Sequence, residues 1–232
     1  MKILFSTLLA AGVALAAPLI AQDRPVVVEL FTSQGCSSCP PADEILAELS
    51  KRDDVIALAL HVDYWDYIGW KDQFGNPDHA ARQRAYAAAG GRKSVYTPEM
   101  IINGSTDIVG AKPMAVAQAI AAHKNDPLRV NLTLSRKGDS LAINAETVNG
   151  AKGPFTVHLL QYTPMEMTHI KRGENAGHAF EYHNIAKNWS VLGTWTADQP
   201  LILTAPLKGA SPAVVIIQHS NAGPIVAAAR VK

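Results

Sequence analysis

Two cysteines, Cys36 and Cys39, lie three positions apart in the stretch ELFTSQGCSSCPP (residues 29–41), and they are the only cysteines in the chain. Two thiols at this spacing can form a disulfide, bind a metal ion or exchange disulfides with other thiols. As a structural crosslink the pair would add little, because the chain-entropy model gives about 2 kcal/mol for a loop of about four residues, against about 4–5 kcal/mol for about 100. The spacing therefore favours chemistry.

The N-terminus indicates the compartment in which these thiols would work. Lys2 is a short positive region, residues 3–16 form an apolar stretch, and Ala16 or Ala21 offers a small residue for cleavage, as is typical of an export signal. A membrane anchor is less compatible with this sequence, because the apolar stretch is shorter than a helix that spans a membrane needs. We expect residues 1–21 to be a cleaved signal peptide and the protein to be periplasmic or secreted, where disulfides form.

The composition argues against several classes of partner. Of the 232 residues 48% are hydrophobic, and the formal net charge is +1. Such a chain can bury the core of one large domain or two small ones. The balanced charge gives no electrostatic footprint for nucleic acid, and no basic run marks an anionic membrane surface. We expect neither nucleic acid nor, after signal cleavage, a membrane among the partners.

The cysteines stand between two elements that would position them. Residues 25–31 form an apolar run that predicts a buried parallel strand. From Cys39 onward apolar residues recur at helical spacing, with Asp43 among the polar positions outside the apolar face. Residues 55–60 predict a second strand, and together the three elements predict a right-handed βαβ unit. Cys36 would then lie at a helix N-terminus, where the helix dipole favours the thiolate.

A polar and aromatic stretch follows the second predicted strand. The carboxyl ends of parallel strands lie at one edge of a sheet, where ligands bind, so we expect its side chains near the cysteines. Those that would form a groove for a peptide or a small thiol are Asp63, Trp65, Asp66 and Trp70. A packed aromatic loop with capping aspartates explains them equally well. His61 would join the thiolates if they bound Cu(I) or Zn²⁺, although a lone His at a strand end is more often structural.

The remainder of the first half predicts a helix, a hairpin and a second helix. Residues 80–89 have a helical pattern that ends at a Gly pair. Asn103 and Gly104 form a strong turn signal between predicted strands at 99–102 and 106–109. A helix is expected from Pro113 to about His123.

This order of elements resembles the thioredoxin fold, and the closer similarity is to DUF1223, a family of exported bacterial proteins of unknown function with a thioredoxin-like fold. The similarity rests on four blocks that span most of the chain after the signal. They are ELFTSQGCSSCPPAD (29–43), HVDYWDYIGWKD (61–72), YTPEMIING (96–104) and RGENAGH (172–178). The resemblance implies a thioredoxin-like α/β domain over residues 22–126.

The resemblance also implies roles for single residues. In thioredoxin-like proteins the first Cys of the pair is the exposed nucleophile and the second resolves the mixed disulfide, so Cys36 would attack and Cys39 would resolve. Pro98, preceded by Thr97, matches the cis-proline that faces the pair and presents a substrate's backbone. A trans proline that enters an edge strand is the alternative.

Such proteins often keep a buried acid as proton acceptor for the resolving Cys. Glu29 stands in the middle of the first predicted strand, where burial would raise its pKa toward the working range. An ion pair with an Arg or Lys is equally compatible with its position.

Residues 127–232 have a different pattern, in which short apolar runs alternate with turn residues and predict an all-β, sandwich-like domain. The strands are expected at 128–134, 141–148, 155–162, 201–205, 213–218 and 225–231, with a further candidate at 188–195. Residues 170–178 are polar and rich in Gly, and we expect Glu174 and Asn175 to brace a turn against the first domain. Contact with the sheet edge that carries the cysteines is the alternative.

We therefore expect an exported thioredoxin-like protein that exchanges dithiol and disulfide with protein thiols, protein disulfides or small thiols, without a bound cofactor. Cys36 and Cys39 would be the redox pair, assisted by Pro98 and Glu29. Two alternatives stay open. The thiolates could bind or deliver copper or zinc, or the protein could be a non-catalytic module that recognises a partner.

Overall fold

The computed structural model describes residues 24–232, so the expected signal peptide lies outside the described residues. Within residues 24–232 eight strands form one sheet in the order β11-β10-β7-β8-β2-β1-β3-β4. These strands are β1 (Val26–Thr32), β2 (Val55–His61), β3 (Glu99–Ile102), β4 (Thr106–Val109), β7 (Phe155–His169), β8 (Ala179–Trp195), β10 (Ala213–His219) and β11 (Ile225–Val231). A second sheet has the order β5-β6-β9, with β5 (Val130–Lys137), β6 (Ser140–Thr147) and β9 (Leu201–Pro206). The helices are α1 (Pro40–Ser50), the 3₁₀ turn η1 (Asp66–Ile68), α2 (Pro77–Ala89) and α3 (Pro113–His123).

The predicted βαβ unit at the cysteines is confirmed. β1 and β2 are parallel, in a register that pairs Val26 with Val55, and α1 connects them. Every residue of both strands is buried, because alternate side chains pack against opposite faces. On one face the core of the sheet contacts apolar residues of α1 and α3. On the other it contacts α2 and residues of β7, β8, β10 and β11. β3 runs antiparallel to β1 and forms the predicted hairpin with β4.

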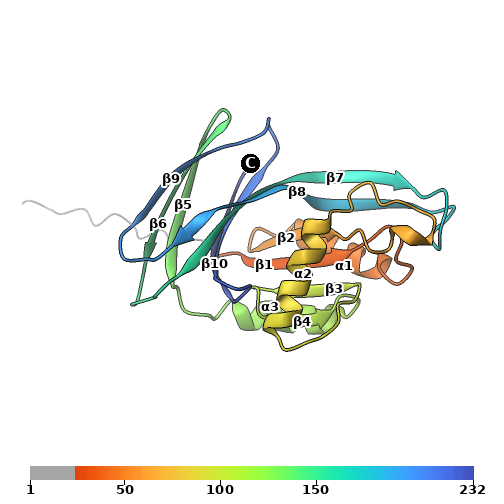
Figure 1. The fold of residues 1–232 in the computed structure, drawn as a ribbon, viewed down its shortest axis with the longest axis horizontal. Coiled ribbons are helices and arrows are strands. Elements are labelled where there is room, and N and C mark those ends of the chain that lie inside the picture. The colour runs from red at the N-terminus through yellow and green to blue at the C-terminus, as the bar shows by residue number, and fades with distance from the viewer. Residues whose placement is uncertain (1–23) are drawn as a thin grey trace, which may run out of the picture.

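The second half contains strands only, as predicted, but four of them continue the first sheet. β8 pairs with β2 in parallel, through Ala59 and Ile185, and joins β7, β10 and β11 to the β1–β2 unit. The three-stranded sheet lies at one end of the molecule (Figure 1). It packs on the far part of the large sheet around Leu141, Phe155 and Val215. The domain boundary predicted near residue 126 stays a prediction.

β7 and β8 are much longer than the sequence predicted. They form one hairpin, paired from Phe155 with Trp195 to His169 with Ala179. The prediction ended β7 at Tyr162 and began β8 near Asn188. The outer part was missed because it lacks regular apolar alternation and because Asn184 and Asn188, residues typical of turns, adopt positive φ inside the strand.

No helix in the described part of the chain is long and apolar enough to cross a membrane.

Candidate functional site

The two cysteines form a disulfide at the carboxyl end of β1. Cys36 and Cys39 are joined by an S–S bond with a Cα–Cα distance of 5.4 Å. Cys39 is the N-cap residue of α1, and Pro40 occupies the first helical turn, where a missing N–H is tolerated. Cys36 lies in the turn before it. The local sequence thus ends the strand and starts the helix within a few residues, which fixes both sulfurs beside a helix N-terminus.

The loop before β3 faces this disulfide. The Thr97–Pro98 peptide bond is cis, as predicted. Ser38 Oγ lies 3.4 Å from Cys36 Sγ and donates to the Thr97 carbonyl at 3.5 Å. The indole of Trp65 donates from Nε1 to Thr97 Oγ1 at 2.8 Å. The structure therefore brings Cys36, Cys39, Thr97, Pro98 and Trp65 together, from three segments of the chain.

The other three residues of the predicted groove are involved in the fold of the loop after β2. Trp70 Nε1 donates to Gln34 Oε1 at 2.8 Å, so its ring lies beside the loop that carries the cysteines. Asp66 Oδ1 accepts from the backbone N–H of Asp72 at 3.0 Å. The Asp63 carbonyl accepts from the N–H of Asp66. The carboxylate of Asp66 therefore caps a turn, as in the alternative interpretation, whereas Asp63 contributes its backbone carbonyl.

Glu29 lies on the face of β1 opposite α1, and its role as a proton acceptor for Cys39 stays a prediction. Successive side chains of a strand point to opposite faces. Glu29 shares its face with Val27 and Phe31, on the side of α2. Its carboxylate accepts from Arg82 Nε at 2.6 Å and from the Tyr86 hydroxyl at 2.5 Å. The ion pair with an arginine, which the sequence left equally open, is what the structure contains.

A different carboxylate, Asp43, lies behind the cysteines. Its backbone N–H donates to the Cys39 carbonyl at 3.1 Å, and its Oδ2 accepts from Thr32 Oγ1 at 3.2 Å. Oδ1 is buried and has no hydrogen-bond partner among the described residues. Burial raises the pKa of Asp43 to about 7, against the opposing effects of His61 and of the Thr32 hydroxyl. Asp43 was not among the residues predicted from the sequence, although its spacing of four from Cys39 places it one helical turn further on.

His61 forms a buried hydrogen bond with Asp72. Its Nδ1 lies 2.7 Å from Asp72 Oδ2, and both side chains are fully buried. Burial acts to raise the pKa of Asp72, but His61 and the N–H groups of Gln34 and Phe74 bring it below its ordinary value. Within residues 24–232 no group of three or more His, Cys, Asp or Glu side chains is arranged to bind a metal ion. His61 is therefore part of the scaffold under the site.

The loop between β7 and β8 contacts the loop that carries the cysteines. Asn175 Nδ2 donates to the carbonyls of Gln34, at 2.9 Å, and of Cys36, at 3.1 Å. Cys36 is only 2% exposed and Cys39 is fully buried. The expectation of an exposed attacking cysteine is therefore wrong for this state of the molecule. Asn175 was predicted to brace a turn against the first domain, and in the structure its side chain bonds to the cysteine loop itself.

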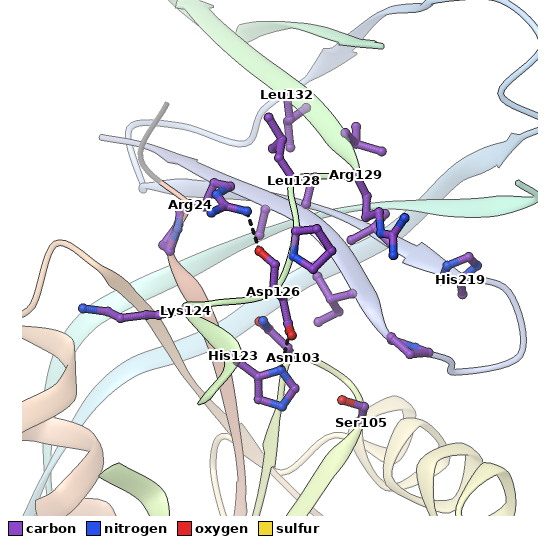
Figure 2. Close-up of a pocket in the computed structure, with 18 residues that line it drawn as sticks. Arg24, Asn103, Ser105, His123, Lys124, Asp126, Leu128, Arg129, Leu132 and His219 are labelled. Atoms are coloured by element: carbon purple, nitrogen blue, oxygen red, sulfur yellow. Dashed lines mark hydrogen bonds and ion pairs between the residues drawn. The ribbon is translucent and has the colours of Figure 1, made fainter. Parts of the chain in front are cut away.

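Two pockets lie away from the cysteines. The larger, of about 410 Å³, is at the amino end of β1, where Arg24, Lys124 and Arg129 are among its lining residues. Figure 2 shows that Arg24 of this pocket donates a hydrogen bond to the backbone carbonyl of Asp126. The second, of about 330 Å³, lies between α2 and the strands β7, β8 and β10, around Trp189. Neither lining includes Cys36 or Cys39.

Comparisons with known proteins place the chain in a family. Residues 27–218 match the model described as "Protein of unknown function (DUF1223)". The crystal structure of protein AGR_C_4864 from Agrobacterium tumefaciens is similar, with a TM-score of 0.78, 32% identity and coverage of 91% of this chain and 96% of that one. HBP35 of Porphyromonas gingivalis has a TM-score of 0.63 at 19% identity, covering 90% of this chain and 75% of that one, which concerns the fold alone. No curated protein matches. This chain therefore belongs to the DUF1223 family.

Proposed function

We propose that this protein is a thiol–disulfide exchange protein whose redox pair is Cys36 and Cys39. One observation carries the proposal: a disulfide between closely spaced cysteines lies at the N-cap of α1, where Ser38 connects Cys36 to the Thr97 carbonyl of the loop before β3. The order of β1, α1, β2, β3, β4 and α3 supports a thioredoxin-like arrangement. The strands after residue 126 would add a sandwich-like part to it. We further propose a periplasmic or secreted location, where such a pair meets protein and small-molecule thiols.

The exchange proceeds in two balanced steps. A thiolate of the partner attacks Cys36 Sγ, the bond between Cys36 and Cys39 breaks, and Cys39 leaves as a thiolate. The partner's second thiolate then attacks its own sulfur in the mixed disulfide and releases Cys36. The partner loses two electrons and the protein gains them; the reverse sequence oxidises the protein. The N–H groups at the start of α1 favour the thiolate form of the released cysteine.

The reduction potential of the pair tests this proposal. The purified protein is equilibrated with glutathione buffers and its free thiols are trapped and counted by mass. We expect reversible titration between about −120 and −270 mV, the range of working oxidoreductases. A pair that stays oxidised well below about −300 mV is a structural disulfide, and would overturn the proposal. Cys36→Ser and Cys39→Ser provide the controls, since neither variant can form the intramolecular bond.

A further inference from the structure

The tip of the β7–β8 hairpin, residues 170–178, lies at the same end of the molecule as the loop between β1 and α1 (Figure 1). It is a compact unit with hydrogen bonds of its own. The N–H of Ile170 donates to the His178 carbonyl, and the N–H of Gly177 donates back to Ile170, each at 2.9 Å. Gly173 and Gly177 adopt φ of +79° and +85°, which glycine tolerates without strain. The bonds within the tip are thus separate from those that join it to the rest of the molecule.

Asn175 is the residue that fixes the tip to the cysteine loop. Its side chain is only 7% exposed, and its amide donates both hydrogen bonds to carbonyls of that loop, at Gln34 and Cys36. A buried carbonyl that loses its donor costs free energy until water or another donor replaces it. The two bonds therefore hold the tip closed on the disulfide.

A second set of contacts holds the base of the tip. Thr168 Oγ1 accepts from Gln34 Nε2 at 3.2 Å and from Gln73 Nε2 at 2.9 Å. Gly173 lies so close to the loop after β2 that a Cβ added to it would be 3.3 Å from Trp70 Cβ. The tip thus contacts both segments that surround the cysteines.

Attack on a disulfide requires direct access to one of its sulfurs. With Cys36 at 2% exposure and Cys39 at zero, neither sulfur can be approached by a thiolate in the closed state. We propose that the 170–178 tip is a movable cover, that Asn175 holds it shut, and that the cover must open before any thiol reacts with the Cys36–Cys39 pair. The proposed cover rests on the proposed exchange function. It adds control of access to the disulfide, so that the bonds of Asn175 set how quickly a thiol reacts with it.

The rate of reduction by a phosphine tests the cover without requiring exchange activity. The phosphorus of tris(2-carboxyethyl)phosphine attacks one sulfur, the S–S bond breaks, and water supplies the oxide oxygen and the two thiol protons. We expect Asn175→Ala to be reduced about ten-fold faster than the natural protein, because two hydrogen bonds to the loop are lost. The rate of the natural protein should level off at high phosphine concentration, where opening becomes limiting. Asn131→Ala, which removes an exposed amide on β5 that donates to Glu146 at 3.5 Å, should react like the natural protein.

Two further measurements guard against a misfolded variant. Thr168→Val keeps the shape of the side chain but removes the acceptor for Gln34 and Gln73, and should also accelerate reduction. In the unaltered protein, reduction should increase hydrogen exchange at the side-chain amide of Asn175, which makes both bonds to the cysteine loop, relative to the backbone amides of β6. The cover is overturned if the natural protein and both folded variants are reduced by the phosphine at equal rates. It is also overturned if the natural protein is reduced as fast as the chain unfolded in denaturant. A potential below about −300 mV with a gated phosphine reaction overturns the exchange function and leaves the cover standing.

Discussion

Two carboxylates near the start of the fold, Glu29 and Asp43, have opposite surroundings, which suit them to different roles. Glu29 is neutralised by the guanidinium of Arg82, which lies at 2.6 Å and stacks on the Trp189 ring at 4.4 Å. Asp43 has no such partner: its Oδ1 is unpaired among the described residues, and burial raises its pKa to about 7. A carboxyl that stays partly protonated near neutral pH is the one suited to exchange a proton behind the cysteines.

The pKa of Asp43 leads to a prediction about stability. The folded pKa of about 7 exceeds the unfolded value of 3.8, so the stabilisation from its neutral form is complete below about pH 4 and is lost as the pH rises through 7. A difference of about three in pKa corresponds to about 4 kcal/mol. We expect Asp43→Asn to remove this loss, so that its free energy of unfolding falls less between pH 5 and pH 8 than that of the natural protein. Urea titrations of the oxidised proteins measure it.

Glu44→Gln is the matched control for this experiment, because Glu44 is an exposed neighbour on the same helix. It should follow the natural protein at both pH values. Parallel curves for Asp43→Asn and the natural protein would mean that the folded Asp43 titrates like an exposed carboxyl.

At the scale of elements, the sequence predicted what depends on local pattern. The β1–α1–β2 unit, the β3–β4 hairpin at Asn103 and Gly104, and α3 after Pro113 all follow from apolar spacing and turn residues. The face of β1 on which the Glu29 side chain lies relative to the cysteines was not predictable, because it depends on which face of β1 each helix covers. The pairing of β8 with β2 was not predictable either, because the two strands are more than 100 residues apart and their contact leaves no local pattern.

The Glu29–Arg82 pair links β1 to α2, and its removal tests how strongly the two are joined. Arg82 Nη2 also donates to Gln218 Oε1 on β10 at 3.1 Å. Arg82→Met leaves the Glu29 charge buried without its partner, and we expect a loss of about 3–5 kcal/mol in the free energy of unfolding. The double variant Glu29→Gln, Arg82→Met should recover a large part of that loss, because no uncompensated charge remains. Denaturant titration at pH 7 measures both.

The same variants distinguish a structural Glu29 from a catalytic one. Glu29→Gln alone should leave the pH dependence of disulfide reduction unchanged, since the carboxylate lies on the face opposite α1. A shifted pH profile in Glu29→Gln, with Asp43→Asn unaffected, would favour the sequence-based assignment.

At the scale of the whole molecule, the two halves of the chain depend on each other. β8 covers the edge of β2 through Ala59 and Ile185, and the core on the α2 face is completed by Leu160, Val214 and Ile216 from the second half. The hairpin that completes this core is also the one whose tip reaches the cysteines. Thus the all-β half both supports the sheet and supplies the cover of the disulfide.

A fragment of residues 24–126 tests whether the predicted boundary separates two units that fold alone. Without β8 the edge of β2 is unpaired, and the apolar face that Leu160, Val214 and Ile216 bury is open to water. We therefore expect the fragment to lack near-ultraviolet circular dichroism and a cooperative urea transition, and to recover both when mixed with a separately made fragment of residues 127–232. The intact chain gives the reference signal. A cooperative transition in the isolated 24–126 fragment would mean that the β1–α1–β2 unit folds on its own, and that the second half only adds the cover.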